Sequence, residues 1–169
     1  PTDFESQWKI TGESIRNACQ NLDPKTPRIL VLNYPGNPTG MTYTSNELSD
    51  IAQAAKEQNI LIISDEIYGW LNHSNNHESI ATYYPEGTFI TSGLSKWCGA
   101  GGWRLGTGIF PLNASNEFKI TYNGIASETY STTAAPIQFT ATYIYNNLDK
   151  FQSFIQSQQH ILKTVSQSI

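Results

Sequence analysis

A lysine and an arginine stand eight positions apart in SGLSKWCGAGGWRLG, the stretch at 92–106. Five glycines crowd this stretch, and glycine lets a backbone approach a ligand closely although fixing its conformation costs entropy. A lysine in a tight, partly desolvated site can lose its proton and form a Schiff base with a carbonyl group. An arginine presents a planar fork of donors that suits two phosphate oxygens. Lys96 and Arg104 are therefore candidates for amine chemistry and anion binding; the plainer alternatives are a surface lysine and a structural arginine.

Four short apolar runs rich in branched residues predict the strands that must position such groups. They lie at 28–33, 60–64, 88–92 and 104–110. A helical pattern separates the first two runs. Strand, helix and strand in this rhythm predict an α/β fold with a parallel sheet and crossover helices.

The helical pattern between the first two strands covers residues 44–59. Thr44 can cap its start, and Glu47 completes a capping box. One face collects the apolar residues that we expect to be buried, Leu48, Ile51, Ala52 and Ala55. Beyond Asn113 the pattern is mostly helical, and Pro136 is typical of a helix start.

Polar residues follow three of the predicted strands, at 33–37, at Asp65 and at 92–96. In open parallel sheets, ligands bind beyond the carboxyl ends of the strands. Asp65 can pair with a cationic group or cap the following turn, and both interpretations stay open for this residue alone. Glu66 points away from Asp65 in extended backbone, so we expect a structural role for it.

The composition is that of a soluble globular protein. Of 169 residues, 38% are hydrophobic and 14% charged, with a net charge of −4 that argues against nucleic acid as the main partner. No apolar run approaches the roughly 20 residues that span a membrane, and no signal-peptide pattern opens the chain. Cys19 and Cys98 are isolated thiols, which fits a reducing compartment, so we expect a cytoplasmic protein.

The sequence gives weaker evidence for a metal site or a nucleotide site than for the amine and anion chemistry of residues 92–106. His73 and His77 stand four apart with Glu78 adjacent, a spacing that can bind a metal on a helix. Their stretch, NHSNNHES, is turn-like, so a solvated loop is the favoured interpretation and no metal is expected. No Gly-x-x-x-x-Gly-Lys-Ser/Thr string is present, and no Gly-x-Gly-x-x-Gly follows a strand.

Three motifs in a fixed order resemble one enzyme family. GLSKWCGAGGWRLG (93–106) resembles the pyridoxal-phosphate attachment signature of class I and II aminotransferases. NYPGNPTG (33–40) looks like that family's Asn-Pro-Thr-Gly loop, and SDEIY (64–68) looks like its Asp-x-x-Tyr turn. ASETYSTTAAPIQ (126–138) is similar to a stretch near the end of the large domain. The resemblance covers nearly the whole chain, but only the central part of a full family member.

The resemblance implies an α/β three-layer sandwich with a mostly parallel sheet, the aspartate aminotransferase-like large domain of a fold type I enzyme, truncated at both ends. Residues 1–147 would form part of this pyridoxal-phosphate-binding domain. Residues 148–169 would begin the long helix that leads toward a small domain, because apolar residues recur at helical spacing from Asp149 to Ile169 without a stop signal. We therefore expect a piece of a longer homodimeric protein, inactive as a fragment.

The resemblance also assigns roles around the cofactor. Lys96 would hold it as a Schiff base and then move a proton as general base and acid, and Asp65 would pair with the ring nitrogen. Lys96 and Asp65 are the predicted catalytic residues. Tyr68 and Asn37 would donate hydrogen bonds to the phenolate oxygen; the alternatives from the residues alone are a core tyrosine and a turn asparagine.

A phosphate anchor completes the predicted cofactor site. Arg104 and Ser95 would bind the phosphate, with the glycines allowing close approach. Many family members have a phosphate-binding serine three residues before the lysine, where this chain has Gly93. Whether Ser92 replaces that serine is left open.

The implied reaction exchanges an amino group between an amino acid and a 2-oxo acid. Two alternatives remain: a carbon–sulfur beta-lyase that uses the same residues, and a ligand-sensing domain of a transcription regulator that borrows the fold without turnover. The residues do not name the amino acid.

Overall fold

Four strands form one sheet in the order β1-β2-β3-β4 in the computed structural model, which describes residues 2–168. Their bounds are Arg28–Asn33, Ile60–Asp65, Thr88–Gly93 and Gly106–Ile109. β1 pairs with β2 and β2 with β3 in parallel, so Asn33 lies opposite Asp65 and Asp65 opposite Thr91. The α/β class and the mostly parallel sheet are therefore confirmed.

The predicted strands agree with the observed ones within two residues at each end. The largest differences are at β4, which we expected over 104–110. Arg104 has a left-handed backbone (φ 53°) after a short 3-10 turn at Gly101–Trp103 (η3), and this conformation ends the extended run on that side.

The chain divides into two compact units. The first unit comprises Pro1–Gly69, Glu78–Ser92 and Gly108–Asn113. The second unit comprises Trp70–His77, Gly93–Thr107 and Ala114–Ile169.

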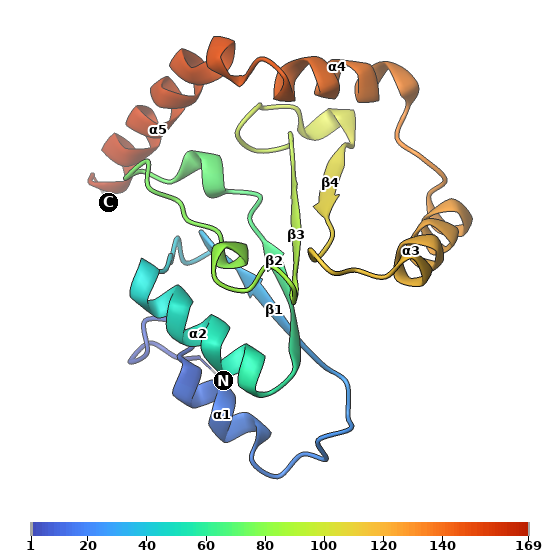
Figure 1. Ribbon diagram of the computed structural model, residues 1–169. Coiled ribbons are helices and arrows are strands. Elements are labelled where there is room, and N and C mark those ends of the chain that lie inside the picture. The colour runs from blue at the N-terminus through green and yellow to red at the C-terminus, as the bar shows by residue number, and fades with distance from the viewer. Residues whose placement is uncertain (1, 169) are drawn as a thin grey trace. The chain divides into compact units, whose positions relative to one another are not determined.

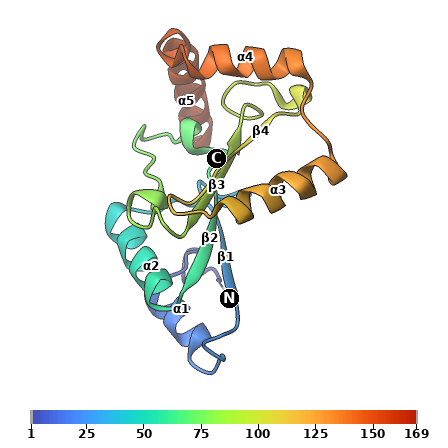
Figure 2. The ribbon, with the colours of Figure 1, turned by 45° about the vertical axis from the view of Figure 1, so that its right-hand side comes forward.

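Two helices of the first unit, α1 (Gly12–Cys19) and α2 (Ser45–Glu57), lie side by side along one face of β1 and β2 (Figures 1 and 2). The predicted capping box at the start of α2 is present: Thr44 accepts a hydrogen bond from the Glu47 amide, and the Glu47 side chain bonds the Thr44 amide. The four residues predicted to be buried in α2 are buried. The capping box of α1, made by Thr11 and Ser14, gives this short helix its start.

The core of the first unit lies between these helices and the strands. Alternate residues of β2 point into it: Ile60, Ile62 and Ser64 are buried. On the opposite face of the sheet, Ile29 and Val31 of β1 are 61% and 67% exposed.

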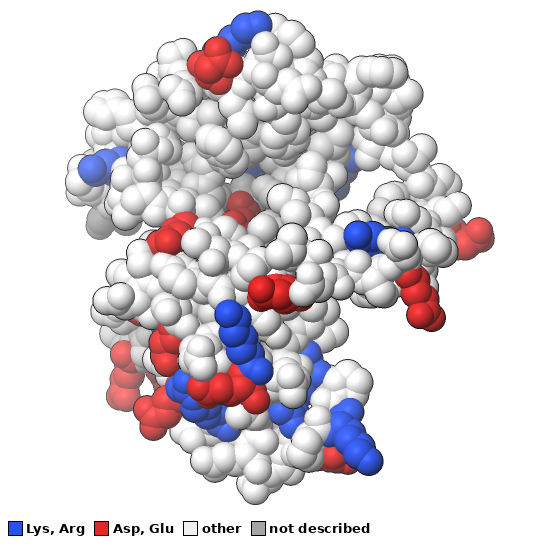
Figure 3. Space-filling view, viewed as in Figure 1, with Lys and Arg blue, Asp and Glu red and all other residues white. Residues whose placement is uncertain are grey.

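Two basic side chains on the surface of the first unit form ion pairs with carboxylates of α2. Lys9 Nζ lies 2.8 Å from a Glu47 carboxylate oxygen, and Arg16 Nε lies 2.7 Å from a Glu57 carboxylate oxygen. Figure 3 shows Lys and Arg among Asp and Glu over α1 and α2, with no basic patch on that face.

The second unit contains α3 (Asn116–Thr129), α4 (Ala135–Tyr145) and α5 (Gln152–Ser166). Pro136 lies in the first turn of α4, as predicted. A 3-10 turn at Leu148–Phe151 (η4) precedes α5, so the α-helix begins three residues after Asp149. The buried core of this unit consists of Leu94, Trp97, Ala100, Leu105, Ala141, Ile144 and Ile155.

The remaining 3-10 turns are η1 (Gly69–Leu71) and η2 (Ile80–Thr82). Within residues 2–168, no helix combines the length and apolar character needed to cross a membrane.

Candidate cofactor site

Asp65 lies at the carboxyl end of β2 and receives a hydrogen bond on each of its carboxylate oxygens. Asn33 Nδ2 donates to Oδ2 over 3.1 Å, and Thr91 Oγ1 donates to Oδ1 over 3.2 Å. These two partners stand opposite Asp65 on the neighbouring strands, so the parallel register itself brings them there. Because both donors are neutral, they orient the carboxylate without neutralising its charge.

The loop after β1 carries Asn37 beside Tyr68. Asn37 Nδ2 lies 3.4 Å from the Tyr68 hydroxyl oxygen, which accepts in this bond. The Asn37 amide in turn donates to Asn33 Oδ1 over 3.1 Å. Asn33 therefore links the two groups: its amide nitrogen bonds Asp65 and its amide oxygen holds the Asn37 loop.

A tight turn closes this loop. The Gly40 amide donates to the Gly36 carbonyl over 2.7 Å, and the Gly36 amide donates to the Met41 carbonyl over 2.8 Å. Gly40 has φ 68°, a left-handed conformation that costs glycine little and most other residues more. This turn fixes the loop that presents Asn37.

Lys96 occupies a turn in the second unit whose direction is set by its neighbours. Leu94 and Trp97 are both fully buried, whereas Lys96 is exposed. The centroid of the Trp97 ring lies 5.7 Å from that of Trp70 and 6.2 Å from that of Tyr145. The backbone carbonyl of Trp97 accepts a 2.7 Å hydrogen bond from Gln158 Nε2. Burial on both sides of Ser95 and Lys96 thus leaves these two side chains at the surface of the unit.

Arg104 folds back on the same glycine-rich loop. Its Nη1 donates to the Gly101 carbonyl over 2.8 Å, and a Cβ at Gly101 would lie 3.7 Å from the Ser95 carbonyl. Ser95, Gly101 and Arg104 are therefore close together. The left-handed backbone of Arg104 costs about 1–3 kcal/mol for a residue other than glycine, a strain that tends to occur at functional sites. A carbonyl partner leaves the guanidinium charge available to an anion.

Cys98 shares this loop, and burial raises the pKa of its thiol. The thiol stays protonated at neutral pH, so the structure gives it no role as a nucleophile beside Lys96.

The six predicted site residues form two groups. Asn37, Asp65 and Tyr68 lie at the strand ends of the first unit, whereas Ser95, Lys96 and Arg104 lie on one loop of the second unit. That the two groups meet in one site stays a prediction of the sequence. Asn33 and Thr91 had no role in that prediction. They could have been identified from their positions opposite Asp65 in the register of the parallel sheet.

The donor set fits pyridoxal phosphate in its chemistry. The cofactor requires an amine, an anion for its ring nitrogen, donors to its phenolate oxygen and an anchor for its phosphate. Asp65 offers an oriented carboxylate, and Asn37 and Tyr68 lie beside each other after the neighbouring strands. Gly101 adjoins Ser95 without a side chain of its own, which leaves space for an anion beside Arg104.

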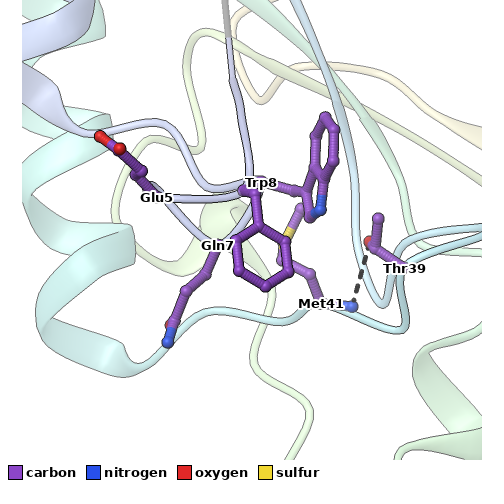
Figure 4. A pocket seen from close by; sticks show the side chains of 6 residues that line it. Glu5, Gln7, Trp8, Thr39 and Met41 are labelled. Atoms are coloured by element: carbon purple, nitrogen blue, oxygen red, sulfur yellow. Dashed lines mark hydrogen bonds between the residues drawn. The ribbon is translucent and has the colours of Figure 1, made fainter.

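A separate pocket of about 530 Å³ lies in the first unit, lined by Phe4, Glu5, Gln7, Trp8, Thr39 and Met41. Figure 4 shows the Trp8 ring and the Met41 side chain facing this pocket, with Thr39 bonded to the Met41 amide over 3.3 Å. None of the predicted cofactor-binding residues lines it.

His73 and His77 do not belong to a metal-binding cluster. Among residues 2–168, no three His, Cys, Asp or Glu side chains gather where they could hold a metal ion.

Comparison with known proteins gives the family. The sequence model described as aminotransferase class I and II matches residues 1–169. Aspartate aminotransferase of Bacillus sp. (strain YM-2) is 38% identical over 146 residues, covering 84% of this chain and 35% of that protein. The probable N-acetyl-LL-diaminopimelate aminotransferase of Bacillus subtilis (strain 168) is 43% identical over 99 residues, covering 59% of this chain and 24% of that protein.

Solved structures agree with the sequence comparisons. Aspartate aminotransferase from Thermus thermophilus with maleate aligns with a TM-score of 0.82 at 27% identity, covering 94% of this chain and 40% of that one. The chain therefore spans less than half the length of these relatives.

Proposed function

This chain belongs to the class I and II aminotransferase family, and on that premise we propose that the protein exchanges an amino group between an amino acid and a 2-oxo acid. The family depends on pyridoxal phosphate. When bound, this cofactor supplies an aldehyde that takes up an amine and a protonated ring that withdraws electrons. The observation that carries the proposal is the Asp65 carboxylate, held by Asn33 and Thr91 at the carboxyl ends of three parallel strands.

Asp65 has the properties needed to keep a ring nitrogen protonated. Its two oxygens are oriented by neutral donors, so a carboxylate held in this way can accept an N–H. An anion fixed in advance stabilises a developing positive charge without reorganising during the reaction.

Lys96 is proposed to carry the covalent link and the proton transfer. Its Nζ stands on an exposed side chain between two buried anchors, Leu94 and Trp97. Once released from the link, the neutral amine would take a proton from the substrate's alpha carbon as general base and return one as general acid.

Tyr68 and Asn37 are proposed to donate to the phenolate oxygen. Donors at this oxygen would stabilise its anionic form. Arg104 and Ser95 are proposed to bind the phosphate, which orients the ring without taking part in proton transfer.

The names of the relatives suggest the class of substrate. One relative is named for aspartate and another for N-acetyl-LL-diaminopimelate, so we propose an amino acid and a 2-oxo acid without choosing between side chains. By the same family resemblance, we propose a homodimer that works in the cytoplasm.

The proposal is tested on the full-length protein, loaded with pyridoxal phosphate and mixed with a panel of amino acids and 2-oxoglutarate. Glutamate formation supports it. Pyruvate and ammonia from cystathionine without glutamate formation would replace it with the beta-lyase, and bound cofactor without either product would favour the sensing domain.

Borohydride reduction followed by peptide mass mapping tests the role of Lys96 separately. We expect the pyridoxyl group on the peptide that contains Lys96, with Lys56 and Lys119 as internal controls. A pyridoxyl group on either control lysine would overturn the assignment.

A further inference from the structure

A buried carboxylate lies directly after Asp65, on the other face of the strand end. Glu66 is 8% exposed, and three hydroxyl oxygens converge on its Oε1. Ser79 Oγ lies at 2.6 Å and Ser64 Oγ at 2.9 Å. The Tyr34 hydroxyl lies at 3.5 Å, and its single proton is shared with the Glu78 carbonyl at 3.2 Å. Ser64 and Tyr34 are themselves fully buried.

Tyr34 ties this network to the backbone on both sides. Its hydroxyl accepts a 2.6 Å hydrogen bond from the Ile80 amide, and its own amide donates to the Asp65 carbonyl over 3.2 Å. Burial, and then the charge of Glu66, raise the pKa of the Tyr34 hydroxyl, so it keeps its proton. Tyr34 thus joins the strand end that carries Asp65, through its backbone amide, to the start of η2, through its hydroxyl.

The backbone of Glu66 closes the turn that carries Tyr68. The Glu66 amide donates to the Thr91 carbonyl over 2.9 Å, and the Gly69 amide donates to the Glu66 carbonyl over 2.9 Å. Movement of the Glu66 side chain would therefore shift both neighbours that the proposed function uses, Asp65 before it and Tyr68 two residues after it.

A carboxylate in a core is costly unless it is fully hydrogen-bonded, and apolar residues of similar size are often at least as stable. Retaining Glu66 here needs a reason other than stability. We propose that Glu66, with Tyr34, Ser64 and Ser79, forms a buried brace that fixes the directions in which Asp65 and Tyr68 present their polar atoms. Glu66 is then a positioning residue, and this inference rests on the proposed function.

The test uses the full-length protein and the pH at which the absorbance of its bound cofactor changes. In Glu66→Ala the donors to the phenolate oxygen lose their direction, so this transition moves to higher pH by on the order of half a unit or more. Cofactor affinity also falls by roughly tenfold. This is the size of the loss in metal affinity when groups that orient metal ligands are removed. Glu66→Gln keeps an acceptor oxygen in place and recovers most of both quantities.

Two controls separate positioning from loss of stability. Thr44→Ala removes the cap of α2 without touching the brace, so it lowers the thermal midpoint and leaves the absorbance transition in place. Glu86→Gln makes the same chemical change as Glu66→Gln at an exposed carboxylate, and neither quantity moves. If Glu66→Ala shifts the transition no more than Thr44→Ala does, the brace has no positioning role.

Other outcomes are also decisive. Should Glu66→Ala fail to fold, Ser79→Ala removes the shortest bond to Glu66 together with the cap that Ser79 gives η2, and an unshifted transition in that variant overturns the proposal. A wild-type protein that binds no pyridoxal phosphate refutes the proposed function instead. In that case amide exchange at Glu66 and Gly69 tests the brace without cofactor, since both amides should exchange at least about tenfold faster in Ser79→Ala than in Thr44→Ala.

Discussion

Asp65 in the first unit and Lys96 in the second are held in place by different means. Asp65 receives side-chain hydrogen bonds from both neighbouring strands. Lys96 stands in a turn directed by the burial of Leu94 and Trp97 on either side of it. Parallel strands bring polar partners together through their register. A glycine-rich loop has no such register and depends on hydrophobic anchors and unusual backbone angles.

This difference predicts different responses to mutation. Changes at the strand ends should disturb an oriented polar group, so they should affect the rate more than cofactor binding. Changes on the glycine-rich loop should remove one function at a time, either the reactive amine of Lys96 or the phosphate anchor at Arg104. Four predictions follow this contrast, all for the full-length protein.

The largest effect is expected for Lys96→Ala. Loss of the only group proposed for proton transfer should lower the turnover number by at least about 10³-fold, in the range that general acid–base catalysis supplies. The side chain is exposed, so the far-ultraviolet circular dichroism and the thermal midpoint should stay unchanged. Turnover within tenfold of wild type would contradict the role of Lys96.

Asp65→Asn comes next, with a fall in turnover number of roughly 10²-fold. The new amide can keep the bond from Thr91, but in the orientation that does so, its nitrogen faces the nitrogen of Asn33 across 3.1 Å. Cofactor affinity, measured by titrating the apoprotein, should change much less because the phosphate anchor remains. Wild-type turnover in Asp65→Asn would remove the proposed charge partner of the ring nitrogen.

Arg104→Ala should reverse that pattern. Removing charged hydrogen bonds to the phosphate should weaken cofactor binding by about 10- to 100-fold, while turnover at saturating cofactor falls less. Arg104→Lys is the matched variant: it keeps the charge without the planar fork and should recover part of the affinity. Unchanged affinity in Arg104→Ala would show that the phosphate is held elsewhere.

The smallest effect concerns the pH dependence of stability in the first unit. Burial alone would raise the pKa of Glu47, but hydrogen bonds from Lys9 and Thr44 lower it below its usual 4.5. The ionised form therefore contributes stability above pH 4.5, and this contribution disappears as pH falls through the lowered pKa. Between pH 6 and pH 3 the free energy of unfolding, measured with urea, should fall as Glu47 becomes protonated in the wild-type protein. Glu47→Gln should not show that part of the fall. Glu128→Gln, an exposed site in α3, should follow wild type.

Much of the fold follows from local patterns in the sequence. Branched apolar runs predict all four strands, and Thr44 with Glu47 predicts the start of α2. α1 is not predicted, because it has only eight residues and its capping box uses Ser14 where Glu or Gln is usual. The start of β4 is predicted two residues early, since a left-handed arginine leaves no mark in an apolar pattern.

For the candidate site, the sequence predicts the motif residues but not all of their hydrogen-bond partners. Asp65 and Lys96 can be identified because they follow strands and match motifs. Asn33 and Thr91 become partners of Asp65 only when three strands are aligned, which a pass along the chain does not do. Glu66 is correctly expected to point away from Asp65. Ser64 stands two residues before it, but its partners Tyr34 and Ser79 come from other segments of the chain and have no local signal.

The unpaired edge of β1 and its exposed apolar side chains affect the solubility of this polypeptide. Within residues 2–168, β1 pairs with β2 alone, so the backbone groups along its other side are open to a further strand. Ile29 and Val31 are exposed on the same strand, whose one charged residue is Arg28 at its start, and an apolar edge is a template for aggregation. A preparation of these residues alone would favour strand addition between copies at high concentration. Val31→Lys, which places a charge at the middle of that edge, should raise its solubility without changing the core.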